Sequence, residues 1–206
     1  ERADSVVFNP HKWLFVPRDF STLYVRRPEA LRRVFSLVPE YLRGDAERAG
    51  QMMPNYMDYG IQLGRRFRAL KAWFVIRCFG REGLAARIRE ACRLALLVAE
   101  WIRSDERFET LAPVEMGVVC FRARAINDGR GSTLSEEALN EFNERLLARI
   151  NATGETYLTH TRLHGRLALR IAVGNLLTNE THLAQVWELI GKQLNLLTDE
   201  QLRFYP

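Results

Sequence analysis

The chain has 206 residues and a mass of 23.9 kDa, with 47% apolar and 27% charged residues. This balance excludes an intrinsically disordered chain, because the apolar content is high and there are only 13 glycines and 7 prolines. No run approaches the roughly 18 consecutive apolar residues that a membrane-spanning helix needs. We therefore expect no membrane partner.

The charge is mildly basic, with 30 Lys and Arg against 25 Asp and Glu, and only Lys12, Lys71 and Lys192 are lysines. An arginine-rich chain could bind nucleic acid. The basic cluster at 65–77, however, falls on one face of a predicted amphipathic helix, and neither zinc-finger spacing nor an RNA-binding sheet motif is present. We interpret the charge as a solvated surface and predict no nucleic-acid partner.

The cysteines, Cys78, Cys92 and Cys120, are few, odd in number and far apart in the sequence. They show no CxxC spacing, and the four histidines add no metal-ligand pattern. This usage predicts reduced thiols in the core, no metal site and a cytoplasmic location.

The first part of the chain predicts strands at 5–9, 13–16 and 22–25, with a turn at Asn9-Pro10 and a helix over 29–35 that Pro28 opens. A strand so close to residue 1, which is not Met, leads us to expect the C-terminal piece of a longer protein. Residues 43–56 contain two glycines and a proline without an apolar period, which predicts a long functional loop.

From Leu63 onward the apolar residues recur with a helical period. The pattern predicts a helix from 63 to a stop at Gly80 and another from 82 through 102. A capping box of Thr133 and Glu136 predicts the start of the next helix, and the last one begins near Glu180. Strands are predicted at 108–111, 117–125, 156–161 and 166–173, the last two joined by a turn at 164–165. Together these elements predict an α+β domain with a helix-covered antiparallel sheet.

Lys12 is the candidate for chemistry, because it follows a short strand and runs into the apolar sequence Trp13-Leu14-Phe15-Val16. Apolar flanks predict a desolvated amine, which is a better nucleophile and can form a Schiff base with an aldehyde cofactor. His11 beside it could hold a phosphate. From the spacing alone, a surface lysine whose stem lies along a half-buried strand is the better fit.

The sequence Asn9-Pro10-His11-Lys12-Trp13-Leu14 resembles the cofactor-lysine motif of pyridoxal-phosphate-dependent group II decarboxylases, in the aromatic-L-amino-acid decarboxylase branch. Ala3-Asp4-Ser5 precedes the motif as in that family. The sequence at 62–74, which contains Leu-Gly-Arg-Arg-Phe-Arg, resembles the helix that leads into the family's small domain. Shorter matches at 80–84 and 169–178 extend the resemblance over essentially the whole chain.

The resemblance implies a fold that combines α/β and α+β parts. Residues 1–70 would be the end of the large domain of a fold-type-I, aspartate-aminotransferase-like enzyme, whose sheet is mainly parallel. Residues 71–206 would be the small C-terminal α+β domain. The family works as a homodimer on a small-molecule amino-acid substrate, with pyridoxal 5'-phosphate as cofactor.

The resemblance also assigns site residues. Lys12 would hold the cofactor as a covalent aldimine, and Asn9 and His11 would help to hold its phosphate. Tyr41 matches the tyrosine of the family's mobile catalytic loop, about residues 41–56 here, which protonates the intermediate after carbon dioxide leaves. Gly64 matches a glycine near the partner subunit's substrate site.

Parts of the family pattern are missing or altered. The carboxylate that pairs with the pyridine nitrogen and the ring-stacking histidine lie upstream of these residues in the family, so we expect this chain alone to be an incomplete enzyme. The sequence Arg18-Asp19-Phe20-Ser21 departs from the family's more usual Asp-Cys-Ser.

Two alternatives to an amino-acid decarboxylase stay open. One is an aromatic aldehyde synthase of the same fold, although such enzymes have phenylalanine where Tyr41 stands. The other is a non-catalytic dimerisation or arginine-rich nucleic-acid-binding domain. Which amino acid is the substrate is not predicted.

Overall fold

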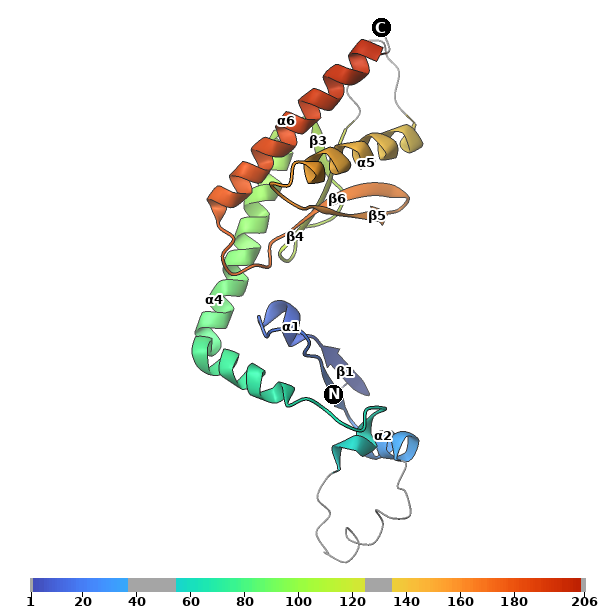
Figure 1. Cartoon of the computed structure of the whole chain (residues 1–206), viewed down its shortest axis with the longest axis vertical. Helices are drawn as coiled ribbons and strands as arrows, with labels where there is room; N and C mark the ends of the chain where they lie inside the picture. The colour runs from blue at the N-terminus through green and yellow to red at the C-terminus, as the bar shows by residue number, and fades with distance from the viewer. Residues whose placement is uncertain (1, 37–54, 125–134, 205–206) are drawn as a thin grey trace, which may run out of the picture. The chain divides into compact units, whose positions relative to one another are not determined.

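The computed structural model describes residues 2–36, 55–124 and 135–204, and Figure 1 draws them as a coloured ribbon. The chain divides into two compact units, Glu1–Leu84 and Ala85–Pro206. The predicted division after residue 70 concerns the whole protein and stays a prediction.

The first unit is built on a two-stranded antiparallel sheet. Strand β1 (Ser5–Phe8) pairs with β2 (Thr22–Val25), with Ser5 opposite Val25 and Phe8 opposite Thr22. Helix α1 (Pro10–Trp13) follows β1, helix α2 (Pro28–Phe35) follows β2, and the 3-10 helix η2 is Tyr56–Tyr59. The predicted strands at 5–9 and 22–25 and the helix at 29–35 are confirmed.

The strand predicted at 13–16 is wrong. Pro10 occupies the first position of α1, where its fixed φ favours a helical turn and its missing N–H costs nothing. The chain then turns at Phe15, whose φ is 56°, and Val16 N–H donates back to the carbonyl oxygen of Pro10 at 3.1 Å. Residues 10–16 therefore form a compact turn, because Pro10 outweighs the apolar pattern after it.

Helix α4 (Arg68–Ser104) is interrupted at Gly80, whose φ of 63° and ψ of 178° lie outside the helical region. This conformation is one that glycine adopts readily and other residues avoid. The predicted break at Gly80 is confirmed, but the predicted start at Leu63 is wrong. Arg65 and Arg66 therefore precede the helix and do not lie on its amphipathic face.

The second unit contains a four-stranded antiparallel sheet in the order β3-β4-β6-β5. The strands are β3 (Phe108–Thr110), β4 (Val118–Ala123), β5 (Thr159–Leu163) and β6 (Arg166–Ala172). Along the chain, helix α5 (Glu136–Ala152) follows β4 and precedes β5, and α6 (Glu180–Phe204) is the last described element. His164 and Gly165 form the β5–β6 turn with φ values of 51° and 80°, as predicted.

In the second unit α4, α5 and α6 lie against the sheet (Figure 1), and the buried side chains of helices and sheet form one core. Val119 and Phe121 of β4 and Leu169 of β6 face it with at most 1% exposure. Their helical neighbours in the core include Leu94, Val98, Ile102, Phe142, Leu146, Ile150, Ile190 and Leu194. The predicted helix-covered antiparallel sheet is confirmed for this unit.

Two asparagines of α5 bind backbone groups of the sheet where β4 and β6 stop pairing, after Phe121 opposite Leu169. The buried Asn143 accepts from Ala123 N–H at 2.8 Å and donates to Ala123 C=O at 3.0 Å. Asn140 accepts from Leu167 N–H at 2.6 Å. These amides replace strand pairing, so that the backbone groups at the end of the ladder stay hydrogen-bonded.

The start of α5 differs from the prediction. Its N-cap is Ser135, whose hydroxyl accepts from Ala138 N–H at 3.2 Å, whereas Thr133 lies outside the described residues. The nearly buried Arg122 donates to Glu136 in the first helical turn at 3.1 and 3.2 Å. Glu136 therefore stabilises the start of α5 through an ion pair with Arg122 of β4.

The cysteines are free thiols, but none of them is buried: Cys78 is exposed and Cys92 and Cys120 are half-buried. The prediction of core thiols is therefore wrong. The helical period places Cys78 on the apolar face of α4, but the neighbouring side chains Phe74 and Ile76 are also more than half exposed.

Candidate active site

Lys12 lies on the single turn of α1, which follows β1 and precedes β2 along the chain. The turn is closed by Lys12 N–H donating to Asn9 C=O at 2.9 Å and Leu14 N–H donating to Pro10 C=O at 3.2 Å. The Lys12 side chain is exposed, so the predicted desolvation is not found within this chain. Its amine is accessible for reaction with a carbonyl compound.

The side chains of Asn9 and His11 are fixed by the segment that enters β2. The Ser21 hydroxyl donates to Asn9 Oδ1. The Nδ1 atom of His11 lies 2.5 Å from Phe20 C=O and 3.2 Å from Phe20 N, so the ring is held through this nitrogen whichever tautomer it adopts. The free edge of the ring then carries Nε2, which can face a ligand.

These groups fit an aldehyde-bearing phosphate ester. An accessible primary amine can form a covalent bond to the aldehyde, and an imidazole and a carboxamide on the same turn can donate hydrogen bonds to phosphate oxygens. Both side chains are oriented by hydrogen bonds before any ligand arrives, which lowers the entropy lost on binding.

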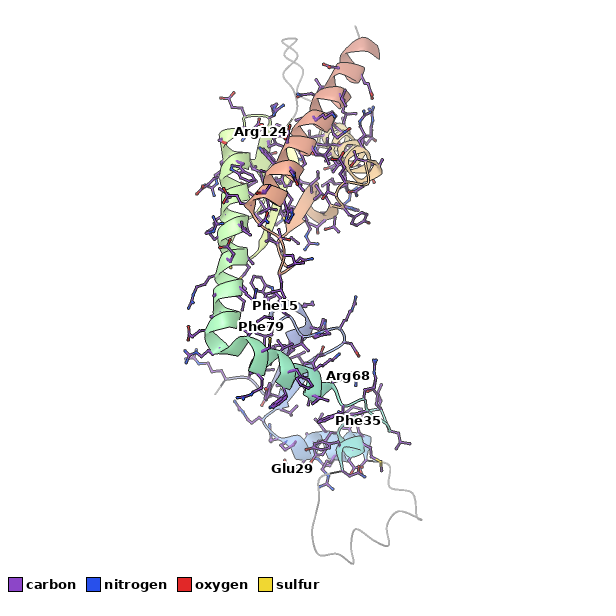
Figure 2. All side chains as sticks on the ribbon, turned by 60° about the vertical axis from the view of Figure 1, so that its left-hand side comes forward. Phe15, Glu29, Phe35, Arg68, Phe79 and Arg124 are labelled. Carbon is purple, nitrogen blue, oxygen red and sulfur yellow. The ribbon has the colours of Figure 1, made fainter. Side chains whose placement is uncertain are left out.

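Asp19 joins the Lys12 turn to the residues that lead into α4. Its carboxylate accepts from Arg66 Nη2 at 2.8 Å on one oxygen, and from Arg68 Nε and Nη2 at 3.2 and 3.0 Å on the other. Arg68 is the first residue of α4 (Figure 2). We call this group the Asp19 clamp.

The clamp keeps its acid ionised. The hydrogen bond from Arg68, with the backbone and the charge of Arg66 adding to it, lowers the pKa of Asp19 to about 2. The clamp is therefore fully charged at neutral pH. Sequence reasoning missed it, because Asp19 and Arg66 are 47 positions apart and no local pattern links them.

Gly64 lies in the short segment between η2 and α4, two residues before Arg66 of the clamp. A Cβ built on Gly64 would have no atom within 4 Å. Beside it, a groove of about 440 Å³ is lined by Arg66, Phe67, Arg68, Leu70, Lys71 and Phe74. The clamp thus connects the element that carries Lys12 with the element that carries Gly64.

Tyr41 and the loop predicted at about 41–56 lie almost wholly outside the described residues. Only Asn55 and Tyr56 of that range are described; the Asn55 side chain caps η2 by accepting from Met57 N–H at 3.4 Å. The role of Tyr41 stays a prediction.

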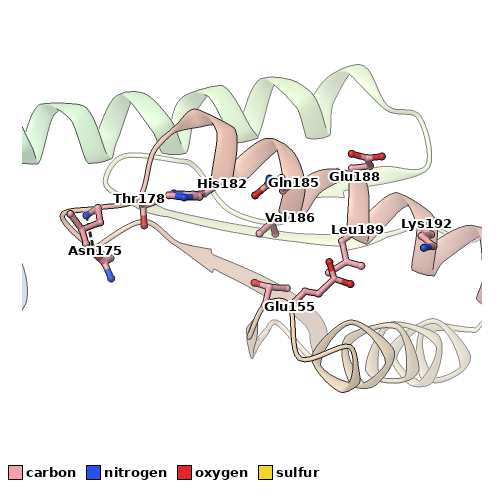
Figure 3. A pocket seen from close by; sticks show the side chains of 11 residues that line it. Glu155, Asn175, Thr178, His182, Gln185, Val186, Glu188, Leu189 and Lys192 are labelled. Atoms are coloured by element: carbon pink, nitrogen blue, oxygen red, sulfur yellow. Dashed lines mark hydrogen bonds between the residues drawn. The ribbon is translucent and has the colours of Figure 1, made fainter.

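A larger cavity, of about 690 Å³, lies in the second unit and contains none of the predicted site residues. Figure 3 shows His182, Glu188 and Lys192 of α6 along it, with Glu155 on the opposite wall. These polar side chains are all exposed. Within the described ranges no three His, Cys, Asp or Glu side chains come together as a metal site, and no helix is long and apolar enough to cross a membrane.

Comparison with known proteins gives consistent results. Residues 1–124 match the family described as "Pyridoxal-dependent decarboxylase conserved domain". The chain is 37% identical over 203 residues to an aromatic-L-amino-acid decarboxylase of Catharanthus roseus, and 37% identical over 198 residues to a phenylacetaldehyde synthase of Petunia hybrida. These matches cover 98% and 96% of this chain but only 38% and 39% of the two relatives.

A solved structure agrees with the sequence matches. The crystal structure of Oryza sativa TDC with PLP and tryptamine superposes with a TM-score of 0.86 at 38% identity, covering 95% of this chain and 39% of that one. The fold described above is therefore shared with about two fifths of that enzyme's chain.

Proposed function

This chain belongs to the pyridoxal-dependent decarboxylase family, and from that premise we propose that the whole protein decarboxylates an aromatic L-amino acid to its amine and carbon dioxide, with pyridoxal phosphate as cofactor. The observation that carries the proposal is the Lys12 turn, where an accessible amine lies beside the two oriented side chains of Asn9 and His11.

Each residue has a proposed task. Lys12 Nζ holds the cofactor covalently, and Asn9 and His11 donate hydrogen bonds to its phosphate. Pyridoxal phosphate supplies an electron-withdrawing ring that stabilises the charge left on the α-carbon when carbon dioxide departs. Tyr41 donates the proton that this carbon then needs. Gly64 leaves room for the aromatic side chain of the substrate.

The assembly is part of the same proposal. Residues 1–70 would complete a fold-type-I large domain, 71–206 would form the small domain, and two copies would associate as a homodimer, with Gly64 near the partner subunit's substrate. The three free thiols support a cytoplasmic location.

An aromatic aldehyde synthase is the second candidate, supported by the 37% identity to the phenylacetaldehyde synthase. Overall identity does not separate the two reactions, since the decarboxylase match has the same value. Tyr41 favours the decarboxylase, because a phenol can donate a proton and the phenylalanine of the synthases cannot.

The test uses the complete protein, loaded with pyridoxal phosphate and given tryptophan, tyrosine, phenylalanine or 3,4-dihydroxyphenylalanine. We expect carbon dioxide and the amine in equal amounts. Borohydride reduction followed by peptide mapping should place the pyridoxyl group on Lys12. Lys12→Ala should abolish labelling and turnover, whereas Lys192→Ala, which removes an exposed lysine of α6, should change neither. A label on Lys71 or Lys192, or release of aldehyde in place of amine, would contradict the proposal.

A further inference from the structure

Asp58 is a buried acid near the end of the first unit's short 3-10 helix. It lies in η2 with 5% exposure, and its Oδ1 atom has no hydrogen-bond donor among the described residues. Its backbone N–H donates to Asn55 C=O at 3.1 Å, so the turn that carries the carboxylate is itself well formed. The unsatisfied group is therefore the Oδ1 atom of the side chain.

The carboxylate borders a pocket of about 310 Å³. Val34 and Phe35 contribute the end of α2, where Figure 2 labels Phe35. The remaining wall comes from Met57, Gly60, Ile61 and Leu63. Among the described residues that line this pocket, Asp58 is the only charged one, and the other side chains are apolar.

A buried carboxylate without a hydrogen bond or a counter-charge is strongly unfavourable. Arg65 is the nearest described cation by chain position, but its guanidinium packs on Gly60, with Nη2 2.7 Å from where a Cβ would stand. In the described part of the chain, Arg65 makes no hydrogen bond to Asp58 Oδ1. Among the described residues Asp58 therefore has no counter-charge, and a cation supplied from elsewhere would stabilise its carboxylate.

We infer that the Asp58 pocket receives the cationic end of a lysine or arginine side chain from the part of the longer protein outside these 206 residues. The apolar walls match the methylene stem of such a side chain, and the carboxylate matches its charged head. Ile61 and Leu63 at the rim are 89% and 79% exposed, as expected of a surface that further chain covers. The chain spans only 38% of the length of its decarboxylase relative, which leaves ample sequence to supply that cover.

The inference does not depend on which reaction the protein catalyses, and its test measures unfolding. In the complete protein, Asp58→Asn should lower the urea midpoint and Asp58→Ala should lower it further, because each leaves the incoming cation less well paired. Glu29→Gln is the matched control, since Glu29 is an exposed acid on α2, and its midpoint should stay at the wild-type value. Replacing each lysine and arginine outside residues 1–206 by glutamine should then reveal one position at which Asp58→Asn has no further effect.

Three results would overturn the inference. The first is a midpoint that Asp58→Asn leaves unchanged or raises, which is the result for an acid that stays unpaired. The second is an Arg43→Gln, Arg48→Gln or Arg65→Gln variant that reproduces the loss and removes the response to Asp58→Asn, which places the partner inside this chain. The third is a midpoint that phenethylammonium raises in the wild type but not in Asp58→Asn, which means that the pocket is open to a free amine.

Discussion

Asn143→Leu should destabilise the second unit strongly, although the two side chains are nearly equal in size. Asn143 is fully buried, and its amide binds the N–H and the C=O of Ala123 at 2.8 and 3.0 Å. Leucine fills the same space but can bind neither group. Both backbone groups then stay buried where β4 no longer pairs with β6.

The magnitude follows from counting the groups left unsatisfied. A buried donor or acceptor that loses its partner costs roughly 1–3 kcal/mol. Two such groups therefore cost about 2–6 kcal/mol, and the larger apolar area of leucine returns about 1 kcal/mol of this. A net loss of about 3 kcal/mol should lower the melting temperature by roughly 6–12 °C.

The assay is thermal and urea unfolding followed by the fluorescence of Trp187, whose ring lies 4.9 Å from Phe108 in the core. Asn140→Leu is the matched control. Asn140 also binds sheet backbone, at Gly165 C=O and Leu167 N–H, but it is half-buried, so water can replace it at a cost of about 1 kcal/mol. If both variants lose the same free energy, burial does not set the cost and the reasoning is refuted.

Three further outcomes are expected. Tyr41→Phe in the complete protein should retain cofactor binding but release aldehyde and ammonia in place of amine, measured by product chromatography; amine at the wild-type rate would exclude Tyr41 as the proton donor. The pKa of Asp19 is lowered to about 2, so the stability contributed by the clamp should be fully present above pH about 4 and be lost as the pH falls toward 2. In Asp19→Asn, acid unfolding should lack this pH-dependent loss of stability. A pH profile identical to that of the wild type would show that the clamp contributes nothing. Gly64→Ala should leave the melting temperature unchanged, since nothing lies within 4 Å of the new Cβ, whereas Gly80→Ala at φ 63° should cost about 1–3 kcal/mol; equal effects would mean that backbone conformation does not distinguish the two glycines.

The clamp has a meaning for the proposed activity. Asp19 follows Lys12 by seven residues and holds Arg66, which follows Gly64 by two. A change at Asp19 should therefore alter how the Lys12 turn and the segment that carries Gly64 are oriented, without removing either one. This makes Asp19 a positioning residue in the proposed enzyme.

Local patterns in the sequence determined much of the second unit. The alternation of Leu167, Leu169 and Ile171 predicted β6, and the helical period after Gly80 predicted the second part of α4, since both depend on residues that are neighbours in the chain. The pattern around Lys12 also placed the candidate amine shortly after a strand, as β1 confirms. In these places the local preference and the tertiary structure agree.

Only the tertiary structure decided the contacts between distant residues. The apolar run at 13–16 predicted a strand. The structure shows instead a helical turn that begins at Pro10 and a chain reversal at Phe15. The Asp19 clamp, the asparagines that end the β4–β6 ladder and the unpaired acid of Asp58 depend on groups that meet through folding. A hydrogen bond between residues 20 or 47 positions apart leaves no periodic trace in the sequence, because its geometry is set by the packing of whole elements.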